Sequence, residues 1–520
     1  MPNLNLPKRW PAQLSSIQRV TLLIFILLIV SSFILLYQYR CGYLDEWDSI
    51  QFAMALEEYN IVKHQPHPPG YPLYIFFAWV IFQSSRDALN ALTVVSVFFA
   101  SLTLGIFLLF AKILFNDLRW GLAASLLLLA TPMFFFTSLR PLSDVPALFF
   151  VVLSLYLAYR YLQNGQTAWL LTGLTVAGLG CGVRITNAFC LLPFAYVMFR
   201  RVSKKQLLWS FLCVSISILL WFIPMVVIGT NGFLQYFSVI TQHWDKCIIR
   251  SDSIFAKGDL VQTLWVRLTG DLGFVYSAFG FGGSMGYKVS PWEVLRLWVF
   301  IGLVSYGILT FRFSSAVGKF LLAWILPYLG FIIVFVPLYG AERYLLPTIP
   351  VFVLGMTYAI KKIFDHGFYA HLSFPTRFCI KLLTLGFVIW LFLSLSLHGA
   401  RIVHAEPPPM IQMVDYVKAH YPPNQVVIIA EYSDRAFEYY AEEYECVWWY
   451  NGTRLLDELM RSSSSQFQGK DVLVTGSALR FYGGRYPAAN FILTASFKRS
   501  EWIIPVMGGN LQLYLWRIKQ

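Results

Sequence analysis

Charged residues are scarce in this chain of 520 residues, because only 13% of it is Asp, Glu, Lys or Arg. A water-soluble globular protein is nearer a quarter charged. Hydrophobic residues instead make up 57% of the chain, and aromatic residues 18%. Such a chain cannot hide its apolar surface in a water-soluble core, so lipid must be its solvent. The composition therefore excludes a soluble globular protein and predicts a polytopic membrane protein built of apolar helices.

Cysteine is also scarce, at seven residues, and its spacing matches neither a disulfide framework nor a zinc motif. The formal net charge of +13 has two interpretations. Lys and Arg collect in the cytoplasmic loops of membrane proteins, whereas a nucleic-acid-binding protein gathers them on one soluble face. Here the basic residues sit beside apolar runs, which favours membrane topology over nucleic-acid binding.

Apolar runs that are long enough to cross a bilayer are easy to find, since a span needs about 20 residues. The run at 20–39 is too long for the core of a signal peptide and lacks a small-residue cleavage site, so we expect an anchored helix. The pair at 168–199 is short, but a hairpin can be added or removed without changing the sidedness of later segments. We predict about 11 spans, at 20–39, 88–114, 119–137, 145–162, 168–183, 187–199, 207–229, 292–311, 318–338, 344–361 and 380–398.

Basic residues between the spans set the expected orientation. With the N-terminus inside, all of them fall on the cytoplasmic side, as the positive-inside rule requires. They are Lys112, Arg119, Arg160, Arg200, Arg201, Lys204, Lys205, Arg312, Lys319, Lys361, Lys362, Arg377 and Lys381. The extracytoplasmic side then receives a first outer loop at 40–87 and the C-terminus. In a bacterium this membrane is the plasma (inner) membrane.

The last part of the chain changes character, which predicts a membrane domain at 1–400 and an extracytoplasmic α/β domain at 401–520. An amphipathic stretch at 410–420 is typical of a helix, and the apolar run at 426–429 is typical of a buried strand. A second helix is expected at 433–444, with Ser433 as its N-cap, and further strands at 472–474 and 511–516. Helices alternating with strands indicate a small α/β fold.

The first outer loop carries three carboxylates in four positions, Asp45, Glu46 and Asp48, directly after the first span. If the segment is helical, Asp45 and Asp48 share one face. Like charges near a low dielectric raise at least one carboxylate pKa, which makes a general base that works near neutral pH. Two other interpretations remain open. Acidic residues suit the first turn of an exposed helix, and oxygen ligands suit a divalent cation.

The same loop continues with a proline-rich segment at 64–74, which places two histidines, His64 and His67, on a stiff backbone. A later outer loop at 230–291 holds His243-Trp244-Asp245-Lys246 among several aromatic residues. That loop either covers the site or lies at the membrane interface as an amphipathic segment.

These motifs resemble the GT-C superfamily of membrane glycosyltransferases, which includes protein O-mannosyltransferases and the aminoarabinose transferases that modify lipid A. Asp45-Glu46 shortly after the first span, followed by His-Pro-Pro about 20 residues on, is the main likeness. The longer HPPGYPLY at 67–74 is similar to a branch with O-mannosyltransferase members. The SLRPLSDVP at 138–146 resembles the second outer loop of the family, and ERYLLP at 342–347 resembles an element that opens a late span.

The resemblance implies that a sugar passes from a polyprenyl-phosphate carrier to an acceptor on the outer side, without a cofactor. An acidic residue of the first outer loop acts as base, a role that falls on Asp45, with Glu46 next. Asp48 has no firm counterpart in the family, and the pattern does not decide which of the three is the base. The motifs also place Tyr71, Asp144 and Tyr344 among the expected substrate-binding residues.

Positive charge must meet the departing phosphate. Arg343 stands at the outer end of a span and is the first candidate for that role, because guanidinium binds phosphate with two donors. Arg140 and Arg184 are also expected at the outer face, and His64 and His67 add possible donors. Alternatively, each arginine is an ordinary interfacial residue paired with a carboxylate such as Asp144 or Glu342.

The sequence thus favours a glycosyltransferase whose partners are a lipid-linked sugar donor, the bilayer, and a protein, lipid or glycan acceptor. The main rival is a membrane transporter or lipid flippase, which would need charged residues deep inside several helices or discontinuous helices. A second rival is an inactive scaffold that presents the C-terminal domain. Because the charges cluster in loops on one side, surface chemistry is the better prediction.

Overall fold

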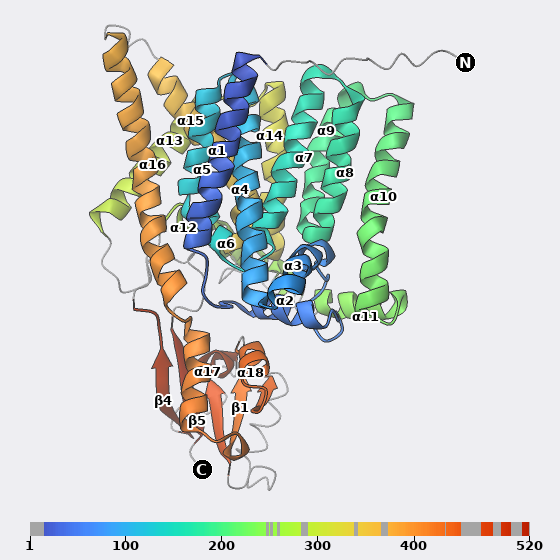
Figure 1. Ribbon diagram of the computed structural model, residues 1–520, viewed down its shortest axis with the longest axis vertical. Helices are drawn as coiled ribbons and strands as arrows, with labels where there is room; N and C mark the ends of the chain where they lie inside the picture. Colours follow the sequence, from blue (N-terminus) through green and yellow to red (C-terminus); the bar gives the residue numbers. More distant parts are fainter. Residues whose placement is uncertain are drawn as a thin grey trace.

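The apolar segments become helices because lipid offers no hydrogen-bonding partner to a free backbone group. A computed structural model describes residues 15–245, 249, 253–256, 260–281, 290–336, 342–365, 373–431, 433–448, 470–481, 490–500 and 512–518. Within them, a helical bundle is joined at one end to a small sheet domain (Figure 1). The predicted Lys246 lies outside the described residues.

The bundle is made of long helices that follow the predicted apolar segments. They are α1 (Ser16–Gln38), α4 (Ala88–Phe115), α5 (Leu118–Ala130), α6 (Pro132–Leu139), α7 (Asp144–Asn164), α8 (Thr167–Val183), η1 (Ile185–Cys190), α9 (Leu191–Arg201), α10 (Lys204–Gly229), α13 (Pro291–Thr310), α14 (Ala316–Phe335), η4 (Glu342–Thr348), α15 (Ile349–Asp365) and α16 (Phe374–Ala405). All eleven predicted spans are therefore helical.

Eight of the described helices are long and apolar enough to cross a membrane alone, and the bent pair α5–α6 makes nine. Three shorter apolar helices are also described, and two of them, α8 and η1–α9, form the hairpin that the sequence marks as short. Counting the two helices of this hairpin with the nine longer candidates gives the 11 spans that the sequence predicts. The protein is an integral, multi-pass membrane protein, as its composition predicts.

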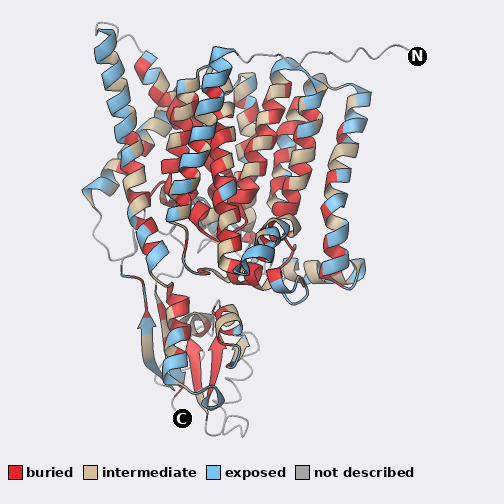
Figure 2. Cartoon of the chain, in the orientation of Figure 1, coloured by how far each residue is buried: buried red, intermediate tan, exposed pale blue. Residues whose placement is uncertain are grey.

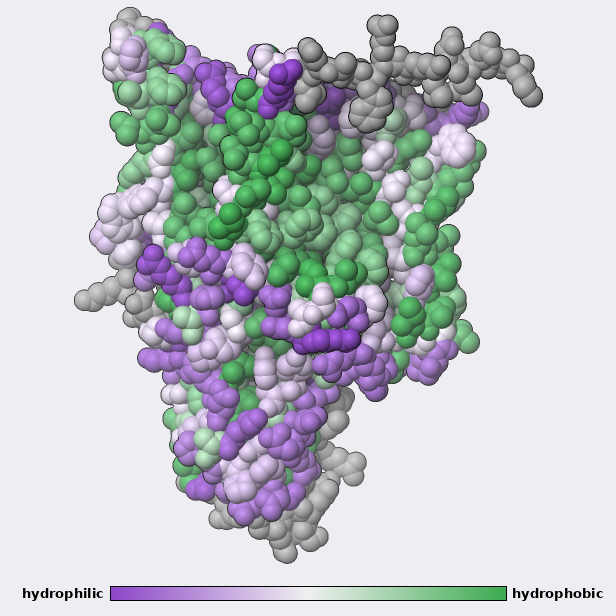
Figure 3. All heavy atoms as spheres, in the orientation of Figure 1, coloured by the Kyte–Doolittle hydropathy of each residue, from purple (hydrophilic) through white to green (hydrophobic). Residues whose placement is uncertain are grey.

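Burial sorts the helices into a centre and a lipid-facing rim. Helices α4 and α7 are mostly buried, whereas only 22% of the apolar stretch of each of α1, α10 and α16 is buried (Figure 2). Figure 3 shows the result as a hydrophobic surface over the bundle, with hydrophilic atoms gathered at its ends and over the C-terminal domain. Exposed side chains on this rim include Leu23, Leu27, Ile34, Phe211, Leu220, Val227, Leu383 and Trp390.

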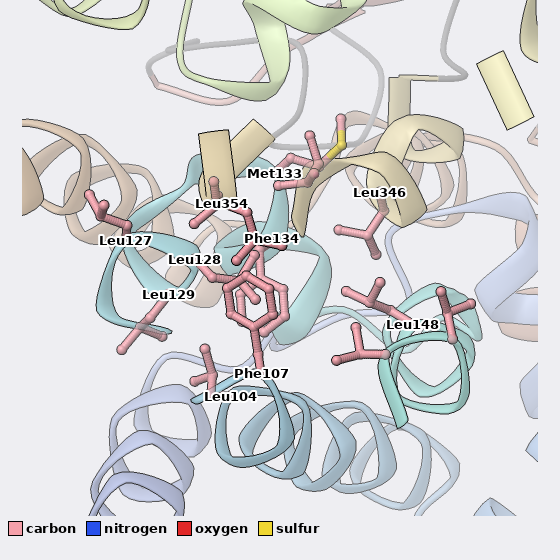
Figure 4. Close-up of a cluster of buried hydrophobic side chains, with 14 of the residues drawn as sticks. Leu104, Phe107, Leu127, Leu128, Leu129, Met133, Phe134, Leu148, Leu346 and Leu354 are labelled. Atoms are coloured by element: carbon pink, nitrogen blue, oxygen red, sulfur yellow. The ribbon is translucent and has the colours of Figure 1, made fainter. Parts of the chain in front are cut away.

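The centre of the bundle is packed around the break between α5 and α6. Pro132 lacks the N–H that would continue α5, and the two helices meet at a bend of 65°. The Ser396 hydroxyl of α16 donates to the carbonyl oxygen of Ala130 at 3.1 Å, next to the break. Figure 4 shows the surrounding core, where α4, α5, α6, α7 and the η4–α15 segment contribute Leu104, Phe107, Leu127, Leu128, Leu129, Met133, Phe134, Leu148, Leu346 and Leu354.

Shorter helices cover the end of the bundle opposite the N-terminus (Figure 1). The first outer loop forms α2 (Trp47–Glu57) and α3 (Pro72–Ser85). The loop predicted at 230–291 contains α11 (Phe233–His243), the short turn η3 (Ile254–Ala256) and α12 (Leu260–Ala278). Helix α11 exposes Phe233, Leu234 and Phe237 and buries Tyr236, which fits a helix lying at a membrane interface.

The C-terminal domain follows α16 and holds a five-stranded sheet in the order β2-β1-β3-β5-β4. Strand β1 pairs in parallel with β2 and β3, while β5 is antiparallel to β3 and β4. The elements are α17 (Pro409–His420), η6 (Pro423–Gln425), β1 (Val426–Ala430), α18 (Asp434–Tyr440), β2 (Glu445–Trp448), β3 (Asp471–Thr475), α20 (Gly476–Phe481), β4 (Phe491–Phe497) and β5 (Leu513–Ile518).

This α/β architecture agrees with the sequence pattern, with differences in detail. The predicted helix at 433–444 ends at Tyr440, and the Ser433 side chain makes no capping hydrogen bond. Strands β2 and β4 were missed because β2 has no buried residue and β4 buries only its two end residues, which weakens the hydrophobic signal.

Candidate active site

The acidic segment of the first outer loop lies where α2 begins. Helix α2 starts at Trp47, and the backbone N–H of Glu46 donates to the Ser49 hydroxyl at 3.0 Å. Asp45 therefore precedes the helix, while Asp48 belongs to its first turn. Asp45 and Asp48 would share a helical face only if the whole segment were helical, and that condition is not met because the chain is extended at Glu46.

Asp45 faces a buried arginine from the second outer loop. Arg140 Nε donates to Asp45 Oδ2 at 2.7 Å, and a second guanidinium nitrogen of Arg140 pairs with Glu46. The side chain of Asp45 is 0% exposed and that of Arg140 3%. Arg140 directly follows α6, so the bend at Pro132 sets the direction of α6 and with it the position of this guanidinium group.

Arg343 is the centre of the site, because it contacts three carboxylates from two parts of the chain. Its Nη1 lies 3.3 Å from Glu46 Oε2 and 3.6 Å from Asp144 Oδ2, and its Nη2 binds Asp48. The residue lies in η4, and its contacts with Glu46 and Asp48 place it against the first outer loop.

A third arginine completes the charge cluster. Arg184 Nη1 lies 3.1 Å from Asp144 Oδ1 and donates to the Ser143 hydroxyl at 3.1 Å. Its guanidinium carbon stands 4.8 Å from the ring centroid of Tyr344, a cation–π distance. Four carboxylates thus meet three guanidinium groups. Arg140 and Arg184 directly follow α6 and α8, and Arg343 lies in η4.

The carboxylate pKa values differ from the sequence expectation. Burial raises the pKa of Glu46, but Arg140 and Arg343 outweigh it, so the pKa is lowered. Burial also opposes ionisation of Asp48, yet Arg343 and His67 hold the pKa of that carboxyl far below its ordinary value. The prediction that crowding raises a pKa is therefore wrong for Glu46 and Asp48, because arginine charge exceeds mutual repulsion.

His67 is locked by hydrogen bonds on both ring nitrogens. Gln51 Oε1 accepts from the backbone N–H of His67 at 3.1 Å and lies 2.7 Å from Nδ1, while Tyr71 Oη lies 2.9 Å from Nε2. The same Gln51 atom faces the backbone N–H and the Nδ1 of His67. Because the backbone N–H can only donate, that atom is the amide oxygen, and Nδ1 must therefore carry a hydrogen to donate to it. Nε2 then accepts from the Tyr71 hydroxyl.

This arrangement makes His67 a neutral residue that orients its neighbours. Burial lowers the pKa of His67 to about 4, against an opposing effect of Asp48. His67 Nδ1 lies 3.8 Å from Asp48 Oδ1. Because both ring nitrogens of His67 are hydrogen-bonded, His67 and Tyr71 form a rigid pair next to the charge cluster, which we call the brace.

His64 and His243 lie beside this brace. The His64 ring centroid is 5.9 Å from that of His243, and the His67 centroid is 6.5 Å from it. Burial lowers the pKa of His64 to about 4 and also lowers the pKa of His243. Helix α11 therefore places His243 beside the site, while the exposed apolar residues of the same helix also fit the interfacial interpretation.

Gly70 shows why the proline-rich segment is so restricted. Its φ is +112°, and an added Cβ would lie 2.7 Å from Ile61 and 2.9 Å from the Tyr59 hydroxyl. The Tyr59 hydroxyl donates to the Gly70 carbonyl oxygen at 2.7 Å. Both the backbone angle and the close approach require glycine here.

The site also includes residues that the sequence did not single out. Gln51 orients His67, and its position three residues after Asp48 on α2 is the only sequence signal for it. Asp434 of the C-terminal domain accepts the indole N–H of Trp47 at 3.1 Å. Nothing in the sequence relates two positions so far apart.

Among the described residues, no group of three or more His, Cys, Asp and Glu side chains is arranged to hold a metal ion. The predicted site carboxylates face arginines instead. Every predicted site residue nevertheless lies in or beside one cluster at the same end of the bundle.

Comparisons with known proteins bear on this geometry. Residues 66–228 match the family described as dolichyl-phosphate-mannose-protein mannosyltransferase. That stretch includes His67, Tyr71, Arg140, Asp144 and Arg184. A comparison with curated protein sequences gives no match.

Solved structures match over nearly the whole chain. ArnT from Cupriavidus metallidurans bound to undecaprenyl phosphate superposes with a TM-score of 0.53 at 11% identity, covering 95% of this chain and 97% of that chain. The Archaeoglobus fulgidus oligosaccharyltransferase, tethered with an acceptor peptide containing the NVT sequon, gives a TM-score of 0.54 at 12% identity, covering 87% and 69%.

The chain has the GT-C fold. The likeness carried by the outer-loop motifs is thereby confirmed, and with it the predicted fold class. Helix α2, whose first turn carries Asp48, lies at the end of the bundle that faces the C-terminal domain (Figure 1).

Proposed function

We propose that this protein is a glycosyltransferase that moves a sugar from a polyprenyl-phosphate donor to an acceptor hydroxyl on the extracytoplasmic side. The observation that carries the proposal is the contact of Arg343 with Glu46, Asp48 and Asp144 at the end of the bundle. A guanidinium held among carboxylates at the membrane edge can exchange one of them for a phosphate. The match of residues 66–228 to a mannosyltransferase family supports the same chemistry.

The donor half of the reaction follows from the arginines. Breaking the bond between the sugar C1 and the phosphate oxygen leaves negative charge on the lipid phosphate. Arg343 meets that charge, and Arg184, which shares Asp144 with it, supports its position. The outward exposure of apolar residues on the bundle rim suits a donor whose tail stays in lipid.

The acceptor half needs a base, and Asp45 is our candidate. Its Oδ2 is oriented by Arg140, while its Oδ1 has no hydrogen-bond partner among the residues that the structure describes. Glu46 and Asp48 are instead both held by Arg343. The acceptor O–H proton passes to Asp45 as the oxygen attacks C1, so the products are the glycosylated acceptor and the polyprenyl phosphate. Because the Asp45 side chain is fully buried, the segments over it must open for an acceptor to arrive.

The proposed reaction uses no cofactor or metal ion. Each of the four carboxylates of the cluster already pairs with a guanidinium group, and the arginines supply the positive charge that the departing phosphate needs.

The rival transporter or flippase is less consistent with where the charges lie. The residues of the cluster occupy helix ends and loops at one end of the bundle, whereas a transport pathway needs ionisable groups near its middle.

The test is to incubate purified protein with a panel of polyprenyl-phosphate sugars and measure release of polyprenyl phosphate. Wild type should turn over at least one donor, with or without EDTA, and Asp45→Asn should be slow. Arg119→Ala, at the opposite end of the bundle, is the matched control. Absence of turnover with every donor, or movement of donor across vesicles without chemistry, would reject the proposal.

A further inference from the structure

The C-terminal domain is packed directly on the acidic segment of the first outer loop. Helix α18 runs along this segment, and Ala436 and Phe437 share one hydrophobic cluster with Leu44, Ile50 and Phe52. At the other end of α18, the Tyr440 phenol lies against the backbone of Leu44 and near Asp45. The domain is therefore part of the wall around the site.

Trp47 is the side chain that joins the two domains. Its indole N–H donates to Asp434 Oδ1 at 3.1 Å, and the Arg435 guanidinium carbon lies 6.0 Å from its ring centroid. Arg435 also reaches the carbonyl oxygen of Lys63 at 3.5 Å. The side chain of Asp434 is 13% exposed, so the bond is shielded from water.

The hydrogen bond between Trp47 and Asp434 affects the site through the two residues next to Trp47 in the chain. Glu46 and Asp48 flank Trp47 in the chain, and both bind Arg343. The Trp47 ring also lies 6.0 Å from the His67 ring, whose Nδ1 faces Asp48. A shift of Trp47 therefore moves the carboxylates of Glu46 and Asp48 and lengthens their ion pairs with Arg343.

We propose that Asp434 is a positioning residue of the C-terminal domain, which fixes Trp47 and through it the alignment of Glu46 and Asp48 with Arg343. The inference rests on the proposed transferase function. It assigns the C-terminal domain a part in the reaction, because misplacement by about 1 Å costs up to about 100-fold in rate. Without Asp434, the acidic segment keeps its residues and loses their alignment.

The first experiment is a double-mutant cycle on the transfer rate. Asp434→Leu removes the acceptor and Trp47→Phe removes the N–H donor, so each should lower kcat by about tenfold to 100-fold. The double variant should lose no more than either single variant, because both cut the same bond. Asp434→Asn keeps an oxygen acceptor and should restore most of the rate. Additive losses, or wild-type kcat in Asp434→Leu, would overturn the proposal.

A matched control separates positioning from loss of the domain fold. Asp471→Asn weakens the exposed ion pair with Arg517 in the same sheet and should leave kcat near wild type. If Asp434→Leu does not fold, Trp47→Phe carries the comparison with wild type.

Hydrogen–deuterium exchange gives a readout that does not depend on activity. Asp434→Leu should raise exchange at the start of α2, around 46–50, while Asp471→Asn should not. If wild type transfers no sugar but exchange rises as expected, the proposed function fails and the coupling stands. If wild type is active and neither rate nor exchange responds, the coupling fails alone.

Discussion

Arg140 Nε binds Asp45 Oδ2 at 2.7 Å, and both side chains are buried where the first two outer loops meet. The pair fixes one carboxylate oxygen of Asp45, and within the described part of the chain the other oxygen has no hydrogen-bond partner. Because Arg140 also binds Glu46, removing the charge of Asp45 does not leave the guanidinium unpaired. This relationship makes Asp45→Asn a test of chemistry more than of folding.

Asp45→Asn should lower the transfer rate by roughly 100-fold or more, the usual scale for loss of a general base. Donor affinity should be nearly unchanged, since a carboxylate gains little from a phosphate. Rates and donor affinities are compared for Asp45→Asn, Glu46→Gln and Asp48→Asn. Normal turnover in Asp45→Asn with a dead Glu46→Gln or Asp48→Asn would move the base to another residue of the loop. Full activity in all three would contradict the mechanism.

Arg343→Ala should weaken donor binding by about tenfold to 100-fold, the range for a lost charged hydrogen bond. Arg343→Lys should retain part of the affinity, because a point charge replaces the bidentate fork incompletely. Binding of undecaprenyl phosphate to purified protein provides the measurement.

Loss of Arg343 also leaves Glu46, Asp48 and Asp144 with fewer partners, so each variant needs a melting curve beside its affinity. Arg119→Ala, whose guanidinium pairs with Asp117 at 2.9 Å at the opposite end, should bind donor normally. Equal affinity in wild type and Arg343→Ala would remove Arg343 from the donor site.

Acid should destabilise the protein in a pH window to which His64 contributes as well as His67. The pKa of His67 is lowered from 6.5 to about 4 in the folded state, so the unfolded chain binds more protons between those values. Stability is therefore lost as pH falls from 6.5 to 4, by about 3 kcal/mol from this residue. His67→Gln should show a smaller loss in melting curves at pH 4.5 and 7, whereas the exposed His420→Gln should match wild type. An unchanged acid loss in His67→Gln would refute the neutral brace.

The C-terminus should lie outside the cytoplasm. The basic residues between spans gather at the end of the bundle that holds the N-terminus, while the C-terminal domain lies at the other end (Figure 1). A reporter enzyme that works only in the cytoplasm, fused after Gln520, should be silent. Fusion after the basic loop at 204–205 should be active as the control. Cytoplasmic activity of the C-terminal fusion would reverse the topology.

The sequence by itself determined the membrane class, the helical segments and the acidic outer loop. These features depend on composition and on short-range spacing, since each span satisfies its own backbone hydrogen bonds in lipid. Strand β1 could also be predicted, because every residue of this buried strand is apolar. Strands β2 and β4 are largely unburied and left no comparable run of apolar residues.

Only the tertiary structure decided how the charges pair. Arg343 and Asp48 lie in distant segments, and their contact depends on the positions of η4 and α2 at the end of the bundle. The sequence therefore suggested raised carboxylate pKa values, whereas the arginines lower those of Glu46 and Asp48. The hydrogen bond between Trp47 and Asp434 could not be predicted either, because no local sequence pattern marks a contact between residues 387 positions apart. Coulomb energy depends on distance through space, and only the fold sets that distance.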